Sequence, residues 1–319
     1  MRASYIVSFI VALTIIISSC SSNDTSVSHH SDTPTSGTVT IYVDETFKPI
    51  MDSEIFVFEA LYKDAHIKVV YAPEAECIKA LLNDSAKVII TPRMLTAQEE
   101  DYLHKIKYYP ATAHIATDAV ALILNRNNPD STFSVNVLKE ILGGKVAKWS
   151  DVSTSNGSGP ITVVFDNPQS SNVRYIQDSV LKGATLSKQV FAAKSNQEVI
   201  QYVMKTPGSI GIIGVNWCKE VNDSSTIHFS DKIRVAGLST LRKEEGVDYP
   251  QPYQAYIALK MYPFSRRIYS INREPYSGLG TGFVSFLSSD KGQRIILKSG
   301  LVPANAPVRI LKVSKNTNY

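Results

Sequence analysis

A polar loop between an apolar strand and a helical pattern is the stretch best suited to bind a small anion. Residues 161–165 are apolar and β-branched, and apolar residues recur at helical spacing from Val173, so we expect strand, turn and helix in that order. Ser170, Ser171 or Asn172 can cap this helix. Free backbone N–H groups and a partial positive charge at a helix start, with hydroxyls beside them, can hold an oxyanion. The alternative is an ordinary helix cap that binds nothing.

Three further loops or strands carry candidate ligand contacts. Thr46 and the loop around Thr91 and Arg93 follow predicted strands, so they should lie on one rim of a sheet. Arg93 is a candidate anion contact, or else a surface arginine. Asp118 is an isolated carboxylate in the apolar run 108–125, and such a group should have a partner. It could accept a hydrogen bond from a ligand that still carries a proton, or cap a turn.

Strands and helices alternate along the chain, which predicts an α/β sheet with helices on its faces. A capped helix is expected from Thr96, and strands at 233–237 and 255–259 should rejoin the first sheet. The other expected strands are 38–43, 67–71, 87–91 and 208–214, and the other expected helices are 47–62, 74–82, 135–142, 196–204, 278–288 and 290–298.

Composition and cysteine spacing exclude several classes of protein. The chain has 319 residues, of which 44% are hydrophobic and 19% charged, and this is ordinary globular composition. Its net charge of +4 is too small and too scattered to indicate nucleic-acid binding. Cys20, Cys77 and Cys218 lie too far apart for a zinc site. We expect Cys77 and Cys218 to be buried free thiols, a disulfide between them being the alternative, and we expect no metal or cofactor.

The N-terminus has the pattern of an export signal. An apolar run at 5–17 precedes small residues and Cys20, which resembles the lipobox of bacterial lipoproteins. In such proteins the cysteine is acylated and becomes the first residue of the mature chain; a plain secretory signal is the alternative. We therefore expect a signal peptide over 1–19, a disordered tether over 20–37 and a polar tail over 312–319.

Several ordered segments resemble one family. They are IATDAVALILNRNNP at 115–129, LKEILGGKVAKW at 138–149, the loop at 170–172, GSIGIIGVNW at 208–217, YPFSRRIYSI at 262–271 and GFVSFLSSDKGQRIILKSGLVP at 282–303. Together with the N-terminus they resemble the PstS-like phosphate-binding lipoproteins of bacterial phosphate ABC importers, within the type II periplasmic-binding-protein superfamily. The resemblance implies two α/β lobes joined by two crossover strands, with the ligand in a cleft between them. It places lobe 1 at 38–122 plus 228–311 and lobe 2 at 123–227.

The resemblance also implies a set of ligand contacts. Carried over residue by residue, they are Thr46, Phe47, Thr91, Arg93, Asp118, Ser170, Ser171 and Asn172, with Asp118 accepting the phosphate proton. The family usually has an arginine shortly before its Ser-Gly-Thr turn, whereas this chain has Asp166. Asp44 and Glu45 add two carboxylates beside the first loop, and they would repel a dianion. Arg93 or Arg174 could compensate for these acids.

The function expected from these features is capture of inorganic phosphate for an ABC importer. The protein would be an exported, lipid-anchored monomer of the bacterial cell envelope, with an ABC permease as its partner. One alternative is the same fold with another oxyanion or a small organic acid; another is an envelope adhesion or assembly lipoprotein with a vestigial cleft. An enzyme is not expected, because the six histidines form no catalytic motif and the glycine-bearing stretches match no nucleotide-binding pattern.

Overall fold

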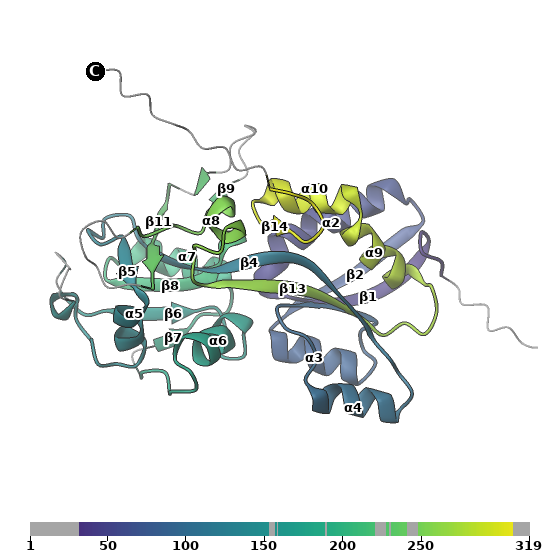
Figure 1. Cartoon of the computed structure of the whole chain (residues 1–319), viewed down its shortest axis with the longest axis horizontal. Helices are drawn as coiled ribbons and strands as arrows, with labels where there is room; N and C mark the ends of the chain where they lie inside the picture. The colour runs from purple at the N-terminus through teal and green to yellow at the C-terminus, as the bar shows by residue number, and fades with distance from the viewer. Residues whose placement is uncertain are drawn as a thin grey trace, which may run out of the picture. The chain divides into compact units, whose positions relative to one another are not determined.

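One continuous sheet organises the chain. The computed structural model describes residues 32–152, 157, 159–188, 190–220, 228–229, 231–240 and 248–308, so the predicted signal peptide, Cys20 and the polar tail lie outside the described residues. The sheet has ten strands in the order β2-β1-β3-β13-β4-β8-β6-β7, and β11 and β14 both pair with β4 (Figure 1). The described chain forms two groups of elements, here called the first and second lobes.

The first lobe has helices on both faces of its strands. Its elements are β1 (Gly37–Asp44), η1 (Glu45–Phe47), α2 (Lys48–Leu61), β2 (Ala65–Ala72), α3 (Glu74–Leu82), β3 (Val88–Thr91), α4 (Ala97–Lys105), β13 (Ser265–Asn272), α9 (Leu279–Ser288), α10 (Asp290–Ser299) and β14 (Val302–Pro303). Side chains alternate along β3, so Ile89 packs in the cluster under α3 and α4, while Val88 and Ile90 pack in the main core. The two-sided burial explains why β3 is apolar throughout.

The second lobe is built on β8, β6 and β7. Its elements are β5 (Thr132–Ser134), α5 (Val135–Leu142), η2 (Trp149–Asp151), β6 (Thr162–Phe165), α6 (Ser171–Tyr175), η3 (Ile176–Val180), β7 (Val190–Ala192), α7 (Asn196–Lys205), β8 (Ser209–Gly214), η4 (Val215–Trp217), β11 (Ile233–Val235), β12 (Gly237–Ser239) and α8 (Gln254–Ala258), and a separate strand pair consists of β9 (Lys219–Glu220) and β10 (His228–Phe229). Gly211 of β8 lets α7 approach closely, because a Cβ there would lie 2.8 Å from carbons of Val199 and Val203.

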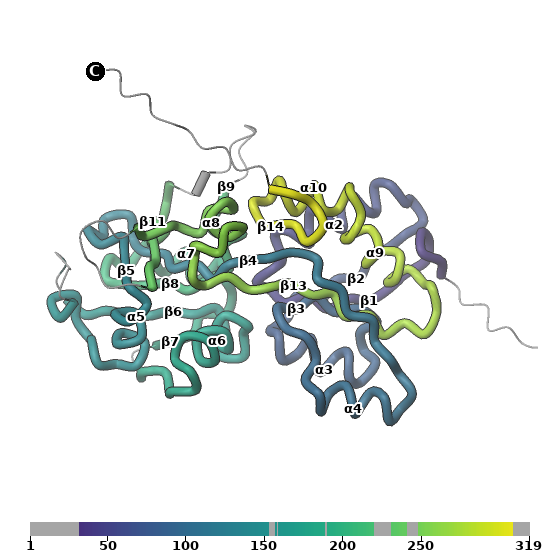
Figure 2. Tube along the Cα trace, viewed as in Figure 1, coloured from purple at the N-terminus to yellow at the C-terminus, as the bar shows by residue number. Residues whose placement is uncertain are grey.

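Strand β4 (Ala111–Asn125) belongs to both lobes. Its residues up to Ala119 pair with β13, and Val120–Leu124 pair with β8 (Figure 2). A second connection runs beside it, since the Tyr262 hydroxyl donates to the Val120 carbonyl at 2.9 Å and the Val120 N–H donates to the Phe264 carbonyl. The expected two-lobe α/β fold is therefore confirmed. Of the two connections, the first is the strand β4 and the second is the turn-containing segment 261–264 that leads into β13. Asp118 lies two residues before Val120, where β4 begins to pair with β8.

Two expectations about individual segments were wrong. Residues 255–259, expected as a strand, lie in and just after helix α8. Strand β11 pairs with Ile123–Asn125 at the far end of β4, so it joins the ten-stranded sheet beside the second lobe and not beside the first-lobe strands as expected. Strand β12 pairs with β5 in a separate two-stranded sheet. Both errors have the same cause: short apolar segments do not show by periodicity whether they are helix or strand, nor which neighbour they pair with.

The predicted disordered tether ends earlier than residue 37. Thr33 and Ser36 form a hydrogen-bonded turn, and the Asp32 carboxylate accepts from the Leu279 N–H at the start of α9 and from the Tyr276 hydroxyl. Gly282 of α9 packs directly against the Pro34 carbonyl. Residues 32–36 are therefore ordered on the first lobe. The polar composition of residues 32–36 did not indicate this order, because their contacts are hydrogen bonds at the start of α9 and close packing against Gly282, not burial of apolar side chains.

Cys77 and Cys218 are both buried and free of disulfides, as expected. Within the described residues, no helix combines the length and the apolar composition needed to span a membrane.

Candidate functional site

The loop after β1 enters the interface between the lobes. Asp44 caps η1, because its Oδ1 accepts from the Thr46 N–H at 2.9 Å. Thr46 and Phe47 are fully buried. Across the interface, the Trp217 indole and the Asn216 amide both donate to the Thr46 carbonyl, at 2.9 and 3.0 Å. The predicted contact residues Thr46 and Phe47 therefore lie where the two lobes meet.

Asp118 has the partner that its burial required. Arg266 of β13 lies directly opposite it across the strand pair, and the Arg266 Nε and Nη2 both donate to Asp118 Oδ2 at 3.1 Å. Arg266 Nη1 donates to the Ser171 hydroxyl of the second lobe at 3.1 Å, and its guanidinium carbon lies 5.4 Å from the centre of the Phe47 ring. Arg266 is 6% exposed and Asp118 is 0% exposed. One buried cation thus contacts both lobes.

From the sequence, Arg93 or Arg174 was expected to balance the extra acids of the site. Arg266, which does so for Asp44 and Asp118, was not identified. The signal was present in the strand pattern: Arg266 and Arg267 are adjacent in β13, so one must face inward and the other outward. Arg266 is buried and Arg267 is exposed.

The polar loop at 166–172 is a compact hydrogen-bonded unit. Ser170 is the helix cap, since its Oγ accepts from the Val173 N–H at 3.3 Å, as predicted for one of three candidates. The same hydroxyl donates to Asp166 Oδ1 at 2.6 Å. Asn172 Nδ2 donates to Asp166 Oδ2 at 3.1 Å and reaches Thr46 Oγ1 at 3.4 Å. Asp166 therefore holds the loop together by accepting hydrogen bonds from Ser170 and Asn172. It stands at the position where the family was expected to have an arginine.

Asn196 joins this unit to the first lobe and was also missed. Its Nδ2 donates to Asp166 Oδ2 at 3.1 Å and to the Glu45 carboxylate. Asn196 lies 30 residues from Asp166 and 151 from Glu45 in sequence, so no local pattern links them. Glu45 thus binds a second-lobe amide instead of standing free beside the ligand site.

Thr91 and Arg93 form a turn whose polar side chains make hydrogen bonds within the first lobe. The Thr91 hydroxyl donates to the Arg93 carbonyl at 2.9 Å, and Thr91 is fully buried. The Arg93 guanidinium makes two hydrogen bonds with Glu99, at 2.7 and 2.9 Å. Glu99 completes a capping box with Thr96 at the start of α4. Arg93 and Arg174 both approach Glu74.

Burial dominates the electrostatics of this site. It raises the pKa of Asp44 to about 7, against the opposing effect of Arg266. It also raises the pKa of Asp118 despite Arg266, and that of Asp166 despite the hydrogen bonds from Ser170 and Asn172. Among the described side chains, four buried acceptor oxygens of the site have no hydrogen-bond partner: Asp44 Oδ2, Asp118 Oδ1, Asn172 Oδ1 and Asn216 Oδ1. The site can therefore accept protons or hydrogen bonds from a ligand as well as offer it one guanidinium.

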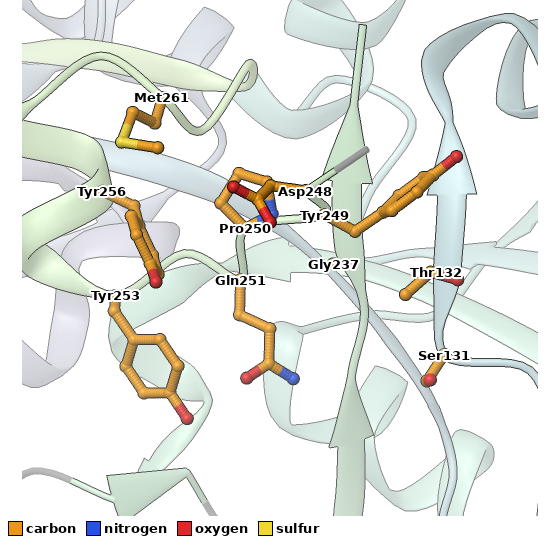
Figure 3. A pocket seen from close by; sticks show the side chains of 10 residues that line it. All are labelled: Ser131, Thr132, Gly237, Asp248, Tyr249, Pro250, Gln251, Tyr253, Tyr256 and Met261. Carbon is orange, nitrogen blue, oxygen red and sulfur yellow. The ribbon is translucent and has the colours of Figure 1, made fainter. Parts of the chain in front are cut away.

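A separate pocket of about 380 Å³ lies in the second lobe (Figure 3). Tyr253, directly before α8, and Tyr256 of α8 line one side and Thr132 of β5 the other, and the Tyr249 side chain extends toward β5. None of the predicted ligand contacts lines it. Within the described residues, no cluster of three or more His, Cys, Asp or Glu side chains could hold a metal ion.

Comparison with known proteins identifies the family. A family model described as a PBP superfamily domain matches residues 28–291. The chain belongs to the PBP superfamily. Its curated relatives include the phosphate-binding protein PstS of Pseudomonas aeruginosa, which is 22% identical over 293 residues covering 86% of this chain and 85% of the relative. The phosphate-binding protein PstS of Borreliella burgdorferi is 26% identical over 269 residues, covering 81% and 86%.

Two solved structures of other proteins share the fold. A phosphate-bound protein from Clostridium perfringens, described as a phosphate ABC transporter substrate-binding protein, has a TM-score of 0.70 at 20% identity and covers 84% of this chain and 100% of its own. An ABC-type phosphate transport receptor from Vibrio cholerae has a TM-score of 0.62 at 19% identity, with the same coverage. The matched relatives are named as binding proteins.

Proposed function

We propose that this chain is an extracytoplasmic solute-binding lipoprotein that captures inorganic phosphate between its lobes for an ABC importer. One observation carries the proposal: the buried Arg266 guanidinium donates to Asp118 in the first lobe and to Ser171 in the second. A guanidinium suits oxyanions because its planar donors match their geometry. Relatives named as phosphate-binding proteins support phosphate as the solute. In the proposal, the remaining predicted contacts lie around or next to the group formed by Arg266, Asp118 and Ser171. They are Thr46, Phe47, Thr91, Arg93, Ser170 and Asn172.

Asp118 would accept the proton of the bound anion. Its Oδ2 is used by Arg266, whereas Oδ1 is buried and without a partner among the described residues. A protonated phosphate can donate to that oxygen, and fully deprotonated sulfate cannot, so the carboxylate would favour phosphate.

A second candidate solute is another oxyanion or a small organic acid. Asp44 and Asp166 are buried beside the same centre, and Asp166 stands at the position of the family arginine. Additional negative charge would repel a dianion by several kcal/mol at short range if poorly screened. A solute with fewer charges or more protons would meet less repulsion.

The remaining features of the proposal follow from the N-terminus and the family. We propose that Cys20 is acylated, that the chain acts as a monomer in the bacterial cell envelope, and that an ABC permease receives the solute. The lobes would be 38–122 with 228–311 and 123–227, except that β10, β11, β12 and α8 are grouped with the second lobe in the structure. No bond of the solute would be broken.

The test is calorimetric titration of the mature, unlipidated chain, freed of endogenous solute, with phosphate and then sulfate. We expect phosphate binding at micromolar concentration or tighter and little response to sulfate. Trp217 fluorescence gives a second readout, because its indole contacts Thr46 across the lobes. A folded protein that binds neither anion would overturn phosphate capture and favour either a small organic acid as the solute or an adhesion or assembly role.

A further inference from the structure

Glu74 is an acid that contacts arginines of both lobes. It is the first residue of α3 and is 3% exposed. Arg174 of α6, in the second lobe, donates through Nε to Glu74 Oε1 and through Nη2 to Oε2 at 2.9 Å. Arg93, which follows β3 in the first lobe, has its Nε 3.5 Å from Glu74 Oε1. The Glu74 carboxylate thus lies between two guanidinium groups that belong to different lobes.

Each arginine is also held by a carboxylate of its own lobe. Arg93 makes its two short contacts with Glu99, whose position is fixed by the capping box of α4. Arg174 approaches Asp178, one turn further along its own helical segment, at 3.4 Å. These local pairs orient the guanidinium groups, whereas the contact between Glu74 and Arg174 spans the lobes. Bidentate contact with a carboxylate is among the stronger charge-assisted interactions in proteins.

We propose that Arg93 and Arg174 form an interlobe anion site that the chain fills with its own Glu74 carboxylate. A two-lobe binding protein closes when one anion accepts hydrogen bonds from both lobes, since that anion has more contacts in the closed state than in the open one. Glu74 is an anion of the chain itself, and it accepts two hydrogen bonds from Arg174 of the second lobe while Arg93 lies 3.5 Å away in the first. The chain therefore closes on an internal anion, and a solute oxyanion or carboxylate competes with Glu74 for the two arginines.

This inference goes beyond the proposed function, because closure on Glu74 does not require phosphate to be the solute. Small-angle X-ray scattering of the solute-free mature chain tests it. Glu74→Gln removes the internal anion, so we expect a larger radius of gyration than in the wild type. Asp178→Asn is the matched control: it removes one negative charge beside the same arginine but breaks a contact within one lobe, and it should leave the radius unchanged.

Arg174→Gln tests the same contact from the other side. Its side chain is 34% exposed, so the variant should fold even if Glu74→Gln does not, and it should open the lobes likewise. Scattering curves of Glu74→Gln and Arg174→Gln that match the wild type would overturn the proposal. Equal opening in Asp178→Asn would also overturn it, because the effect would then come from charge alone.

Titration of the same variants with phosphate and sulfate tests the competition. With Glu74 replaced by glutamine, the two arginines lose the internal anion and keep Glu99 and Asp178 as acidic partners, so we expect at least one of the two anions to bind about tenfold tighter than to the wild type. Unchanged affinity for both would contradict the competition. Failure of the wild type to bind phosphate would overturn the proposed function alone, since the scattering experiment contains no solute.

Discussion

At the scale of single residues, Arg266 decides the charge of the interlobe site. Its charge opposes the effect of burial on Asp44 and Asp118, where burial raises the pKa of both acids, and Lys219 is the other cation that acts on Asp118. Its two hydrogen bonds to Asp118 keep the guanidinium in place, and its third reaches the opposite lobe. The site therefore depends on the donor geometry of arginine as well as on its charge.

Replacing Arg266 with lysine should weaken phosphate binding at least tenfold, or about 1.4 kcal/mol. An ammonium keeps the charge but cannot reproduce the planar set of donors that reaches Asp118 and Ser171 together. Calorimetric titration measures the effect. Arg267→Lys is the control, because Arg267 is the exposed neighbour on the same strand. Equal affinities of the two variants would show that Arg266 is not a ligand contact.

Replacing Asp118 with asparagine should reduce the preference for phosphate over sulfate. The amide can donate to either anion, whereas the carboxylate can only accept from a protonated one. Competition binding with both anions measures the preference, and Asp101→Asn on the exposed surface of α4 serves as the control. A preference unchanged from the wild type would remove Asp118 from the selectivity mechanism.

At the scale of elements, helix ends and close backbone contacts position the site. Ser170 starts α6, and Asp44 starts η1, so both site loops are held by caps at helix starts. Gly214 at the end of β8 lies so close to Thr46 that a side chain there would clash with it. The same device holds residues 33–36 on α9, where Gly282 faces Pro34.

The Gly282→Ala variant tests this docking of the N-terminal segment. Alanine favours a helix by up to about 1 kcal/mol over glycine, but its Cβ would overlap the Pro34 carbonyl. We expect a net destabilisation of about 1–3 kcal/mol, which is usual for overpacking, measured by thermal unfolding. In a chain that begins at residue 37 the same substitution should be neutral or stabilising. A higher melting temperature in the full mature chain would contradict the docking.

At the scale of the whole molecule, buried acids make folding stability depend on pH. Burial raises the pKa of Asp44 to about 7 and that of Glu54 to about 9, and neither oxygen of Glu54 has a partner among the described residues. Above pH 4.5 the unfolded chain loses these protons while the folded chain keeps them, so the free energy of unfolding falls as pH rises. Burial lowers the pKa of Lys219 to about 8, which opposes this trend only above pH 8.

Urea unfolding at pH 5, 6.5 and 8 should therefore show decreasing stability. Glu54→Gln removes the largest of these shifts, so its melting temperature should exceed that of the wild type more at pH 8 than at pH 5. A change of 1 kcal/mol in the free energy of unfolding shifts the melting temperature by about 2–4 °C for a domain of this size class. Parallel pH profiles of the variant and the wild type would show that Glu54 is not buried as a neutral acid.

The local sequence pattern alone determined where several helices form and which residues cap them. The apolar periodicity of α2, α3 and α5 and the caps Thr96 and Ser170 act within a few residues, so they can be read directly from the chain. The ordered family segments added the two-lobe fold. The burial of Asp118 in an apolar run also implied a partner, without indicating which residue it was.

Tertiary structure decided the partners. Arg266 meets Asp118 through strand register across 148 residues, and Asn196 meets Glu45 across 151. Glu74 reaches Arg174 across 100 residues, through the approach of two lobes. Hydrogen bonds and ion pairs act over a few ångströms in space, whereas sequence periodicity reports only neighbours along one helix or strand. The charges of the site could therefore be read from the sequence, but their pairing could not.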